Sequence, residues 1–331
     1  MTVVVTGAAG HLGGNLVRAL VAQGRRVRAV DRTRDWRPLD GLDVERVEGD
    51  ICDLDFVRRA LGGAEAVYHT AGYISLRMDE WPQSAAVNVT GVANVVQACL
   101  ANGVRRLIHF SSIHALTQEP FDQPVDEARP LVAADAPNPP YDRSKAAGER
   151  EVRGAVAQGL DAVILNPTGI IGPHDYRPSF FGRVLLAMGR GAMPALVDAG
   201  FDWVDVRDVV EGAMRAEAQA PAGARYILSG QWVSVPALAA LLEEITGRRP
   251  PRLVAPLWLA QLAAVVAAPF SRRNAQQAFF TPVSLMALRS NRHISHARVT
   301  HDLGYQPRPF RETLHDTFRW FAEAGLLAAA R

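Results

Sequence analysis

The sequence has few cysteines, with Cys52 and Cys99 the two among its 331 residues. They are not spaced as a metal-binding pair, and two cysteines are too few for a disulfide framework. We therefore expect a reducing, cytoplasmic location and predict no metal site.

The sequence also lacks an excess of charge of either sign. It holds 36 basic and 34 acidic residues, which gives a formal net charge of +2. This balance provides no long-range attraction to nucleic acid, so we expect no nucleic-acid partner. No basic segment precedes the first apolar run at 3–5, so no signal peptide is expected.

Long hydrophobic runs are missing as well. The apolar run 257–268 is shorter than the roughly 20 residues of a membrane span, and Pro256 and Pro269 bracket it. We predict no transmembrane segment and interpret this run as a helix buried in the core. A peripheral contact with a membrane surface is the alternative.

In the first half of the chain, short apolar runs alternate with segments of helical periodicity. The runs lie at 3–5, 27–30, 44–47, 66–69, 107–110 and 162–165, and the helical segments at 12–22, 54–61, 87–101 and 141–157. Buried strands that alternate with helices indicate a parallel sheet covered on both faces. The predicted fold class is α/β, a doubly wound parallel Rossmann sheet with a smaller C-terminal α/β lobe that binds the substrate.

The second half is less regular and shows no repeat or low-complexity linker. We expect loops at 173–178 and 194–200, a strand at 225–228 and helices at 235–246 and 308–324. Residues 1–165 would form the dinucleotide-binding domain. Residues 166–331 would mainly form the substrate lobe, with the chain returning to the first domain around 201–228.

A glycine-rich turn follows the first predicted strand. Gly7, Gly10 and Gly13 open the first predicted helix, with His11 and Leu12 between them. Glycine lets backbone N–H groups approach a pyrophosphate, and the helix N-terminus favours the anion. The pattern alone is weak, but its place on the first strand-to-helix turn predicts a nicotinamide dinucleotide site.

Asp31 ends the second predicted strand, about 20 residues beyond the glycine turn. An acid there can accept hydrogen bonds from the adenosine ribose hydroxyls, which favours NAD. Arg32 and Arg34 follow closely, and a guanidinium at this place can bind the 2′-phosphate of NADP. We expect NAD as the cofactor, with NADP as the alternative.

The spacing of Tyr141 and Lys145, at the start of a predicted helix, indicates catalysis. Residues four apart share a helix face, so the Lys145 ammonium can lie near the Tyr141 phenol. A nearby positive charge would lower the tyrosine pKa and suit it to general acid–base catalysis beside a hydride transfer. Ser111 and Ser112 end the strand 107–110, where one hydroxyl can bond the substrate oxygen.

With these residues, the chain resembles an extended short-chain dehydrogenase/reductase of the NAD-dependent epimerase/dehydratase superfamily over nearly its whole length. The matching segments are 6–13, 50–51, 69–72, 88–91, 111–112 and 166–173, with the Tyr141 and Lys145 pair. The resemblance implies a catalytic trio of Ser112, Tyr141 and Lys145. It also implies cofactor contacts from the trio's tyrosine and lysine and from Asp50, Ile51, Thr70, Ala71, Gly72, Asn88, Ser111, Pro167, Thr168 and Ile170.

Departures from the patterns of this superfamily bear on the reaction. Its dehydratases carry an Asp-Glu pair after the active hydroxyl residue, where this chain has Ile113 and His114. Its nucleotide-sugar epimerases usually carry an arginine that clamps the diphosphate, where this chain has Ala199 and Gly200. The run 203–209 resembles that of dihydroflavonol reductases, and the chain's motifs are similar to those of 3β-hydroxysteroid dehydrogenase-like ketone reductases.

We expect an apolar substrate pocket. Its candidate residues are Tyr73, Ser75, Ile113, His114, Phe180, Phe181 and Trp203. We predict an NAD(P)-dependent oxidoreductase that interconverts a small apolar ketone or aldehyde and its alcohol, with Tyr141 as general acid/base. A sugar or nucleotide-sugar epimerase is the alternative, and a non-catalytic dinucleotide-binding sensor is a third hypothesis. Helices 87–101 and 141–157 can pair across a two-fold axis, which makes a homodimer a further expectation.

Overall fold

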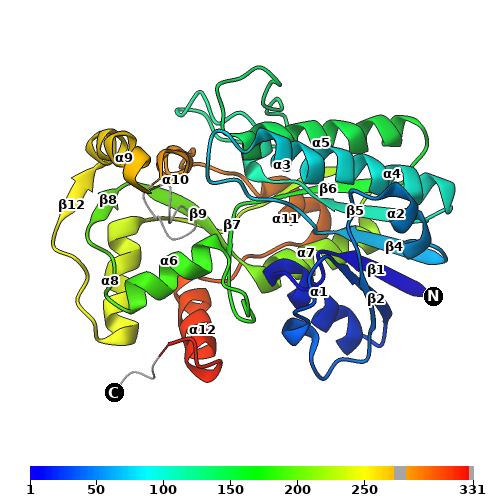
Figure 1. The fold of residues 1–331 in the computed structure, drawn as a ribbon, viewed down its shortest axis with the longest axis horizontal. Coiled ribbons are helices and arrows are strands. Elements are labelled where there is room, and N and C mark those ends of the chain that lie inside the picture. The colour runs from blue at the N-terminus through cyan, green and yellow to red at the C-terminus, as the bar shows by residue number, and fades with distance from the viewer. Residues whose placement is uncertain (272–280, 328–331) are drawn as a thin grey trace.

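The computed structural model describes residues 1–271 and 281–327. Its centre is a seven-stranded sheet whose neighbouring strands are all parallel (Figure 1). In sheet order these strands are β10 (Arg225–Leu228), β6 (Ala162–Pro167), β5 (Arg106–Phe110), β4 (Ala64–His69), β1 (Thr2–Thr6), β2 (Arg26–Asp31) and β3 (Glu45–Glu48). The strand order reverses between β1 and β4, which confirms the predicted doubly wound fold.

Helices cover both faces of this sheet, because each buries an apolar stripe against it. One face carries α1 (His11–Ala22), α7 (Val206–Gln219) and α11 (Ala297–Leu303), and the other carries α2 (Leu54–Ala60), α4 (Gly91–Ala101) and α5 (Pro140–Ala157) (Figure 1). Leu16 and Leu20 of α1 are fully buried in one core, and Val95 of α4 is fully buried in the other. Burying a side chain of this size contributes about 1.5–3 kcal/mol.

A continuous helical run joins α3 (Trp81–Ala85), the π-helical turn η2 (Ala86–Thr90) and α4. Its 21 residues are long and apolar enough, by length and composition alone, to cross a membrane. Core helices of globular proteins pass the same test, and α4 packs here between α2 and α5. This run is therefore weak evidence for a membrane span.

The remaining elements form a smaller α/β lobe beside the large sheet (Figure 1). Its strands are β7 (Gly169–Ile171), β9 (Gly200–Asp205) and β11 (Gln231–Ser234) in one sheet, and β8 (Leu196–Asp198) with β12 (Val254–Pro256) in another. Its helices are α6 (Phe180–Gly189), α8 (Val235–Thr246), α9 (Leu257–Ser271), α10 (Pro282–Ala287) and α12 (Phe310–Glu323). An aromatic core that includes Phe201, Trp203 and Phe321 joins the three-stranded sheet to α6, α8 and α12.

Two expectations about the second half are wrong. The segment 196–198, expected in a loop, forms β8 because β12 pairs with it from a distant part of the chain. Helix α9 forms as expected, but it is not buried on all sides. Within residues 257–264 of α9, Trp258 and Leu262 are exposed, whereas Ala264 packs inward in a cluster with residues of β8 and α10.

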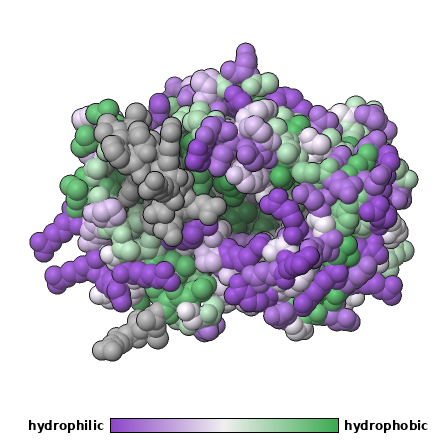
Figure 2. All heavy atoms as spheres, viewed as in Figure 1, coloured by the Kyte–Doolittle hydropathy of each residue, from purple (hydrophilic) through white to green (hydrophobic). Residues whose placement is uncertain are grey.

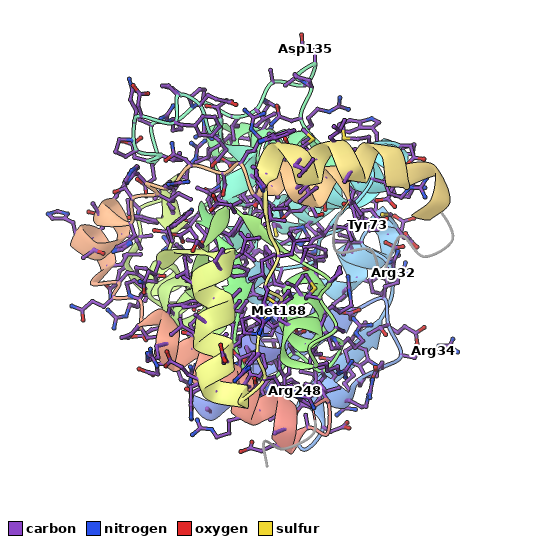
Figure 3. All side chains as sticks on the ribbon, turned by 90° about the vertical axis from the view of Figure 1, so that its left-hand side faces the viewer. Arg32, Arg34, Tyr73, Asp135, Met188 and Arg248 are labelled. Carbon is purple, nitrogen blue, oxygen red and sulfur yellow. The ribbon has the colours of Figure 1, made fainter. Side chains whose placement is uncertain are left out.

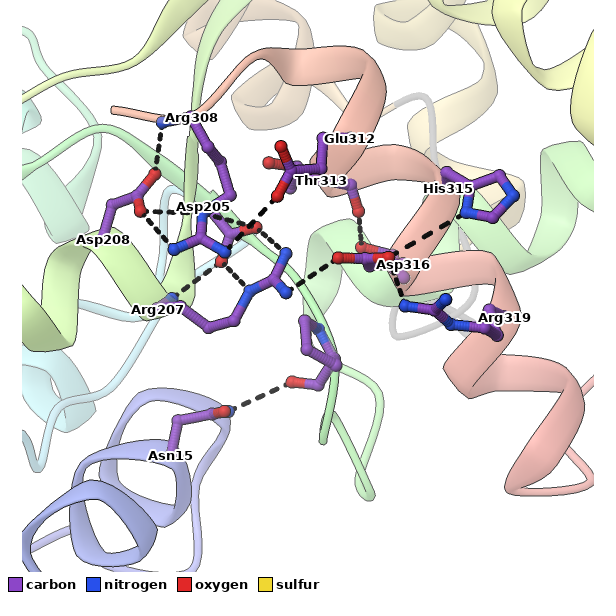
Figure 4. A network of polar contacts seen from close by, with 12 residues as sticks. Asn15, Asp205, Arg207, Asp208, Arg308, Glu312, Thr313, His315, Asp316 and Arg319 are labelled. Atoms are coloured by element: carbon purple, nitrogen blue, oxygen red, sulfur yellow. Dashed lines mark hydrogen bonds and ion pairs between the residues drawn. The ribbon is translucent and has the colours of Figure 1, made fainter. Parts of the chain in front are cut away.

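A network of ion pairs ties the lobe to the helices of the large sheet (Figure 4). Arg207 pairs with Asp205 at 2.7 Å and with Asp316 of α12 at 2.8 Å. Arg308 pairs with Asp208 at 2.7 Å. Asp205 and Asp208 are buried, and a buried carboxylate without its cation is strongly destabilising. The network therefore fixes α12 against the start of α7.

Candidate active site

The predicted site residues gather where the strand order reverses. Gly7 follows β1 and Thr70 follows β4, and both line a cavity of about 520 Å³. Figure 2 shows a hollow with a hydrophobic floor between the two halves of the molecule. Doubly wound folds bind their ligands at this position, and the volume suits a small-molecule site.

The glycine turn is shaped for the close approach of a ligand. Gly7 has a φ of 70°, and a Cβ there would lie 2.7 Å from the Cα of Ala71. A Cβ on Gly13 would lie 2.1 Å from the Gly7 carbonyl oxygen. Helix α1 begins after Gly10 without a side-chain cap, so its first N–H groups can bind a pyrophosphate. The cradle fits a dinucleotide, and the cavity wall continues through His11, Leu12, Gly72, Ser111, Pro167, Thr168 and Ile170.

Asp31 lies at the end of β2 beside this turn, but its carboxylate already has protein partners. One oxygen accepts the N–H of Ala9 at 3.0 Å, and the other accepts the N–H of Thr33 at 2.9 Å. Asp31 therefore holds the glycine turn to β2, a role that the sequence pattern did not reveal. Each oxygen keeps a further lone pair that a ribose hydroxyl can use.

Both arginines that follow Asp31 lie beside acids. The Arg32 guanidinium lies 4.0 Å from the Asp50 carboxylate, and Arg34 pairs with Glu48 at 3.0 Å. Figure 3 shows Arg34 extended away from the body of the molecule. Exposed pairs of this kind contribute little energy, so neither guanidinium is fixed at a phosphate position.

Several predicted cofactor residues lie behind the cavity wall. The Asn88 amide donates to the Tyr73 carbonyl oxygen at 2.8 Å and to the Ser144 hydroxyl at 2.9 Å, and its oxygen accepts the Tyr73 N–H at 2.8 Å. Asn88 thus positions the loop after β4. Ile51 packs in the core beneath α4. The other predicted contacts outside the cavity lining are Asp31, Arg32, Asp50 and Ala71.

The three residues of the predicted catalytic trio lie together in the cavity wall. Ser112 follows β5, while Tyr141 and Lys145 lie one turn apart at the start of α5. The Lys145 ammonium donates to the Phe110 carbonyl oxygen at 2.6 Å, and the Ser112 hydroxyl accepts the N–H of His114 at 3.2 Å. Ser112 and Tyr141 also share a hydrogen bond. Both hydroxyls can therefore meet one substrate oxygen.

The pKa of Tyr141 corrects one sequence-based expectation. Burial raises this pKa to about 12, although the hydrogen bond with Ser112 opposes the rise. The predicted lowering by Lys145 does not occur, because that ammonium bonds the Phe110 carbonyl and burial lowers its own pKa to about 8. Tyr141 is a protonated phenol at neutral pH, which is the form that donates a proton.

A buried network that the sequence analysis missed supports the trio from behind. The Asn166 amide donates to the Ser112 carbonyl oxygen at 2.9 Å and to Glu149 at 3.1 Å. Glu149 is fully buried and pairs with Arg225 of β10 at 2.6 Å. Its charge raises the pKa of Lys145 and so opposes the effect of burial. An acid four residues after Lys145 is the sequence signal that could have revealed this role.

The substrate side of the cavity is mostly apolar. Of the residues predicted for it, Ser75, His114, Phe180, Phe181 and Trp203 line the cavity. Ile113 does not, because the turn η3 (Ile113–Ala115) directs it into a separate core cluster. Tyr73 also lies outside the lining, although the residues after it contribute. Segment 283–290, most of which is α10, forms a further wall of the cavity. No sequence pattern predicted this wall.

His114 lies two residues after the active serine Ser112. Its Nδ1 lies 3.7 Å from the Asp142 carboxylate, and its ring stacks on Phe201. Burial raises the pKa of Asp142. Within residues 1–271 and 281–327, no group of three or more His, Cys, Asp or Glu is arranged to hold a metal ion.

The fold and the site define an extended short-chain dehydrogenase/reductase. Residues 3–228 match the NAD dependent epimerase/dehydratase family. The chain belongs to this family, as the resemblance of its motifs predicted, and it is an enzyme of an NAD-dependent class.

Individual relatives match nearly the whole chain. Sterol demethylase protein B of Methylococcus capsulatus is 39% identical over 99% of this chain and 100% of its own length. A putative dihydroflavonol 4-reductase of Synechocystis sp. is 32% identical over 97% of this chain and 94% of its own. The crystal structure of gox2253 has a TM-score of 0.85 at 30% identity, and the match covers 98% of this chain and 99% of that one.

Proposed function

We propose that the enzyme interconverts an apolar ketone or aldehyde and the corresponding alcohol, with NAD as its hydride carrier. The observation that carries this proposal is the wall facing the trio. Phe180, Phe181 and Trp203 line the cavity that Ser112 and Tyr141 enter. Such a wall favours an apolar substrate body, with the two hydroxyls fixing its one polar atom.

The names of two relatives support a fused-ring substrate. One is called a sterol demethylase protein and the other a putative dihydroflavonol 4-reductase. Sterols and dihydroflavonols both contain fused rings. A substrate of that shape would bury most of its surface against the aromatic wall and α10.

The chain's own residues can perform the proton chemistry. In the reducing direction, Tyr141 donates its phenolic proton to the carbonyl oxygen while Ser112 donates a hydrogen bond to the same atom. The nicotinamide, when bound, supplies the hydride. Lys145 lies one turn further along α5 with its ammonium on the Phe110 carbonyl oxygen, and solvent returns the proton to the Tyr141 phenolate. In the oxidising direction the proton moves from the alcohol to the tyrosine.

The choice of NAD over NADP and the location of the protein in the cell are also part of the proposal. NAD is favoured over NADP because the Asp31 carboxylate would lie close to a 2′-phosphate and repel it. Cys52 and Cys99 are free thiols, which fits a cytoplasmic location. A homodimer through α4 and α5 remains a prediction, as does the division into a dinucleotide domain 1–165 and a substrate lobe 166–331.

A nucleotide-sugar epimerase is the second candidate, and one residue favours it. Arg289 lines the cavity and can bind a phosphate group. However, the segment expected to hold a diphosphate clamp contains Ala199 and Gly200. A single exposed arginine is a weaker diphosphate site than the bidentate pairing typical of such enzymes.

An absorbance assay separates the two candidates. The enzyme is mixed with NADH and fused-ring ketones and, in separate reactions, with NAD and UDP-sugars. A reductase consumes NADH steadily with at least one ketone. The proposal is wrong if no ketone consumes NADH and a UDP-sugar is epimerised without net formation of NADH.

A further inference from the structure

Three large apolar side chains line the substrate cavity and are also exposed to solvent. They are Ile74, Phe121 and Met286, with exposed fractions of 56%, 40% and 37%. Trp203 of the aromatic wall lines the same cavity but is buried. A lining residue that reaches solvent lies where the cavity opens, so we define the apolar mouth as Ile74, Phe121 and Met286.

The fold holds the apolar mouth in place. Strands β4 and β5 are neighbours in the sheet, and Ile74 and Phe121 lie on the segments that follow their carboxyl ends. Met286 belongs to α10. Beyond this helix, the fully buried Asn291 donates its amide to the Gln123 carbonyl oxygen at 2.9 Å. This bond ties the Phe121 segment to the chain that follows α10, so two sides of the mouth are joined.

The exposed part of the cavity lining suits an apolar group better than a charged one. Glu119 and Arg289 are exposed and line the cavity, with one charge of each sign. Opposite charges leave no net charge that would select an ion. Exposed apolar side chains that gather around one cavity mark a ligand-binding groove, because a ligand there removes apolar surface from water.

The inner part of the cavity leaves little room for a large substrate. The glycine cradle, the trio and the aromatic wall all line the one cavity of about 520 Å³, so the dinucleotide and the fused rings share that volume. A small-molecule ligand alone typically occupies a pocket of about 300–1,000 Å³. Any further part of the substrate must therefore extend outward past the mouth.

We propose that the substrate carries an apolar tail, which leaves the fused rings on the side away from the reacting carbonyl and covers the apolar mouth. This inference rests on the proposed function, because it places the carbonyl at Ser112 and Tyr141. A tail fits the mouth better than a second copy of the chain or a bilayer does, since the mouth is continuous with the cavity that holds the trio. Each methylene of the tail that meets the mouth adds to the affinity.

The test uses three ketones that share one fused-ring body. They are β-tetralone and its derivatives with a butyl or a hexyl group on the ring farther from the carbonyl. The wild type is compared with the double variant Ile74→Ser/Phe121→Ser. Met78→Ser is the matched control, because Met78 is 51% exposed on the same loop as Ile74 and does not line the cavity.

Two quantities are measured for each protein and ketone. One is kcat/KM with NADH, and the other is the dissociation constant of the ketone by calorimetry in the presence of NAD, which cannot reduce it. Thermal unfolding shows whether each variant is folded. The comparison within each protein is between the hexyl ketone and β-tetralone, so a change in overall activity does not affect it.

In the wild type and in Met78→Ser, kcat/KM should be at least about tenfold higher for the hexyl ketone than for β-tetralone, and the dissociation constant should fall in parallel. The gain in the double variant should be less than about threefold, because two of the three side chains of the mouth no longer cover the tail. A gain that is equal in all three proteins would come from the low solubility of the tail and would overturn the inference.

The outcomes separate this inference from the proposed function. If the wild type gains no affinity from a tail, the inference is wrong whether or not β-tetralone is reduced. If no ketone is reduced but the tail lowers the dissociation constant only where the mouth is intact, the mouth binds the tail and the proposed reaction is wrong. The inference is also overturned if the wild type, and not the double variant, dimerises in sedimentation velocity or sediments with phosphatidylcholine vesicles.

Discussion

The phenol of Tyr141 and the hydroxyl of Ser112 share a hydrogen bond in the wall of the cavity. Replacing Tyr141 with Phe removes the only atom that we assign to proton transfer and keeps the ring. We expect kcat/KM to fall by about 10²–10⁴-fold, the usual contribution of a general acid. NADH affinity, measured by fluorescence titration, should change little.

Tyr226→Phe is the control for that variant. Tyr226 is buried in the core away from the cavity and bonds Asp302 through its hydroxyl. Its loss should leave kcat/KM near the wild-type value. Comparable activity in Tyr141→Phe and the wild type would remove tyrosine from the mechanism.

The raised pKa of Tyr141 also predicts how the reaction depends on pH. The phenol is protonated throughout the neutral range, because its pKa is about 12. Alcohol oxidation needs the phenolate, whose fraction rises about tenfold per pH unit below the pKa. The oxidation rate should therefore rise from about pH 6 to pH 7, where Lys145, whose pKa is about 8, is still largely charged. A flat profile over that range would show that proton transfer to Tyr141 does not limit the rate.

Asp31 sets the choice between NAD and NADP in our account. The variant Asp31→Asn keeps one oxygen that can accept the N–H of Ala9 or of Thr33 and loses the other of these two bonds, while removing the charge beside a 2′-phosphate. We expect the ratio of kcat/KM for NADPH to that for NADH to rise at least about tenfold. Asp35→Asn, at a partly exposed acid paired with Arg37, should leave the ratio unchanged. An unchanged ratio in both variants would show that another group makes the choice.

At the scale of single residues, the sequence predicted a functional residue where a short local pattern carries the chemistry. The turn glycines and the Tyr141–Lys145 spacing are local, and the structure brings these residues to one cavity. The support from Glu149, Asn166 and Arg225 was missed because their contacts join three separate elements. Ile113 was misplaced because the turn η3 reverses the side on which its side chain points.

At the scale of elements, a buried acid on α7 joins three parts of the large domain. Glu217 accepts the Tyr68 hydroxyl at 2.9 Å and pairs with Arg25 at 3.0 Å and with Arg105 at 3.1 Å. Replacing Glu217 with Gln leaves the buried Tyr68 hydroxyl, the partly exposed Arg25 and the exposed Arg105 without a charged partner. We expect the free energy of unfolding in urea to fall by about 2–4 kcal/mol.

Glu211→Gln is the matched control on the same helix. Glu211 is exposed and pairs with Arg215, so its loss should cost less than about 1 kcal/mol. The pKa of Glu217 is lowered in the folded protein. Its contribution is therefore present at neutral pH and is lost as the pH falls through the range where the folded carboxyl takes up a proton. Equal destabilisation by the two variants would contradict this account.

Strands and helices that belong to the repeating strand–helix pattern could be predicted from the sequence, but a short strand outside that pattern could not. Alternating apolar runs and helical periodicity predicted the strands of the large sheet and its helices α1, α2, α4 and α5 within a few residues, whereas α11 was not predicted. β8 was missed because three residues carry too little pattern and depend on β12. Helix α9 was predicted but placed in the core, because composition alone does not tell which of its sides meets β8 and α10.

At the scale of the whole molecule, the cavity lies between the large sheet and the lobe, and the Arg207 and Arg308 network holds the two together. The sheet side carries the cofactor cradle and the trio, and the lobe side carries the apolar wall. The reaction that we propose needs a hydride from one side and an apolar carbonyl compound from the other. This arrangement is the basis for assigning an oxidoreductase that releases its oxidised or reduced product.

The most direct test of that assignment follows the hydride itself. NADH that carries deuterium at the reactive C4 position is incubated with the enzyme and a fused-ring ketone, and the products are examined by mass spectrometry and NMR. The account predicts one deuterium on the new carbinol carbon for each NADH consumed. It would be contradicted if no ketone acquired deuterium while, in a separate reaction with NAD, a UDP-sugar was epimerised with no net formation of NADH.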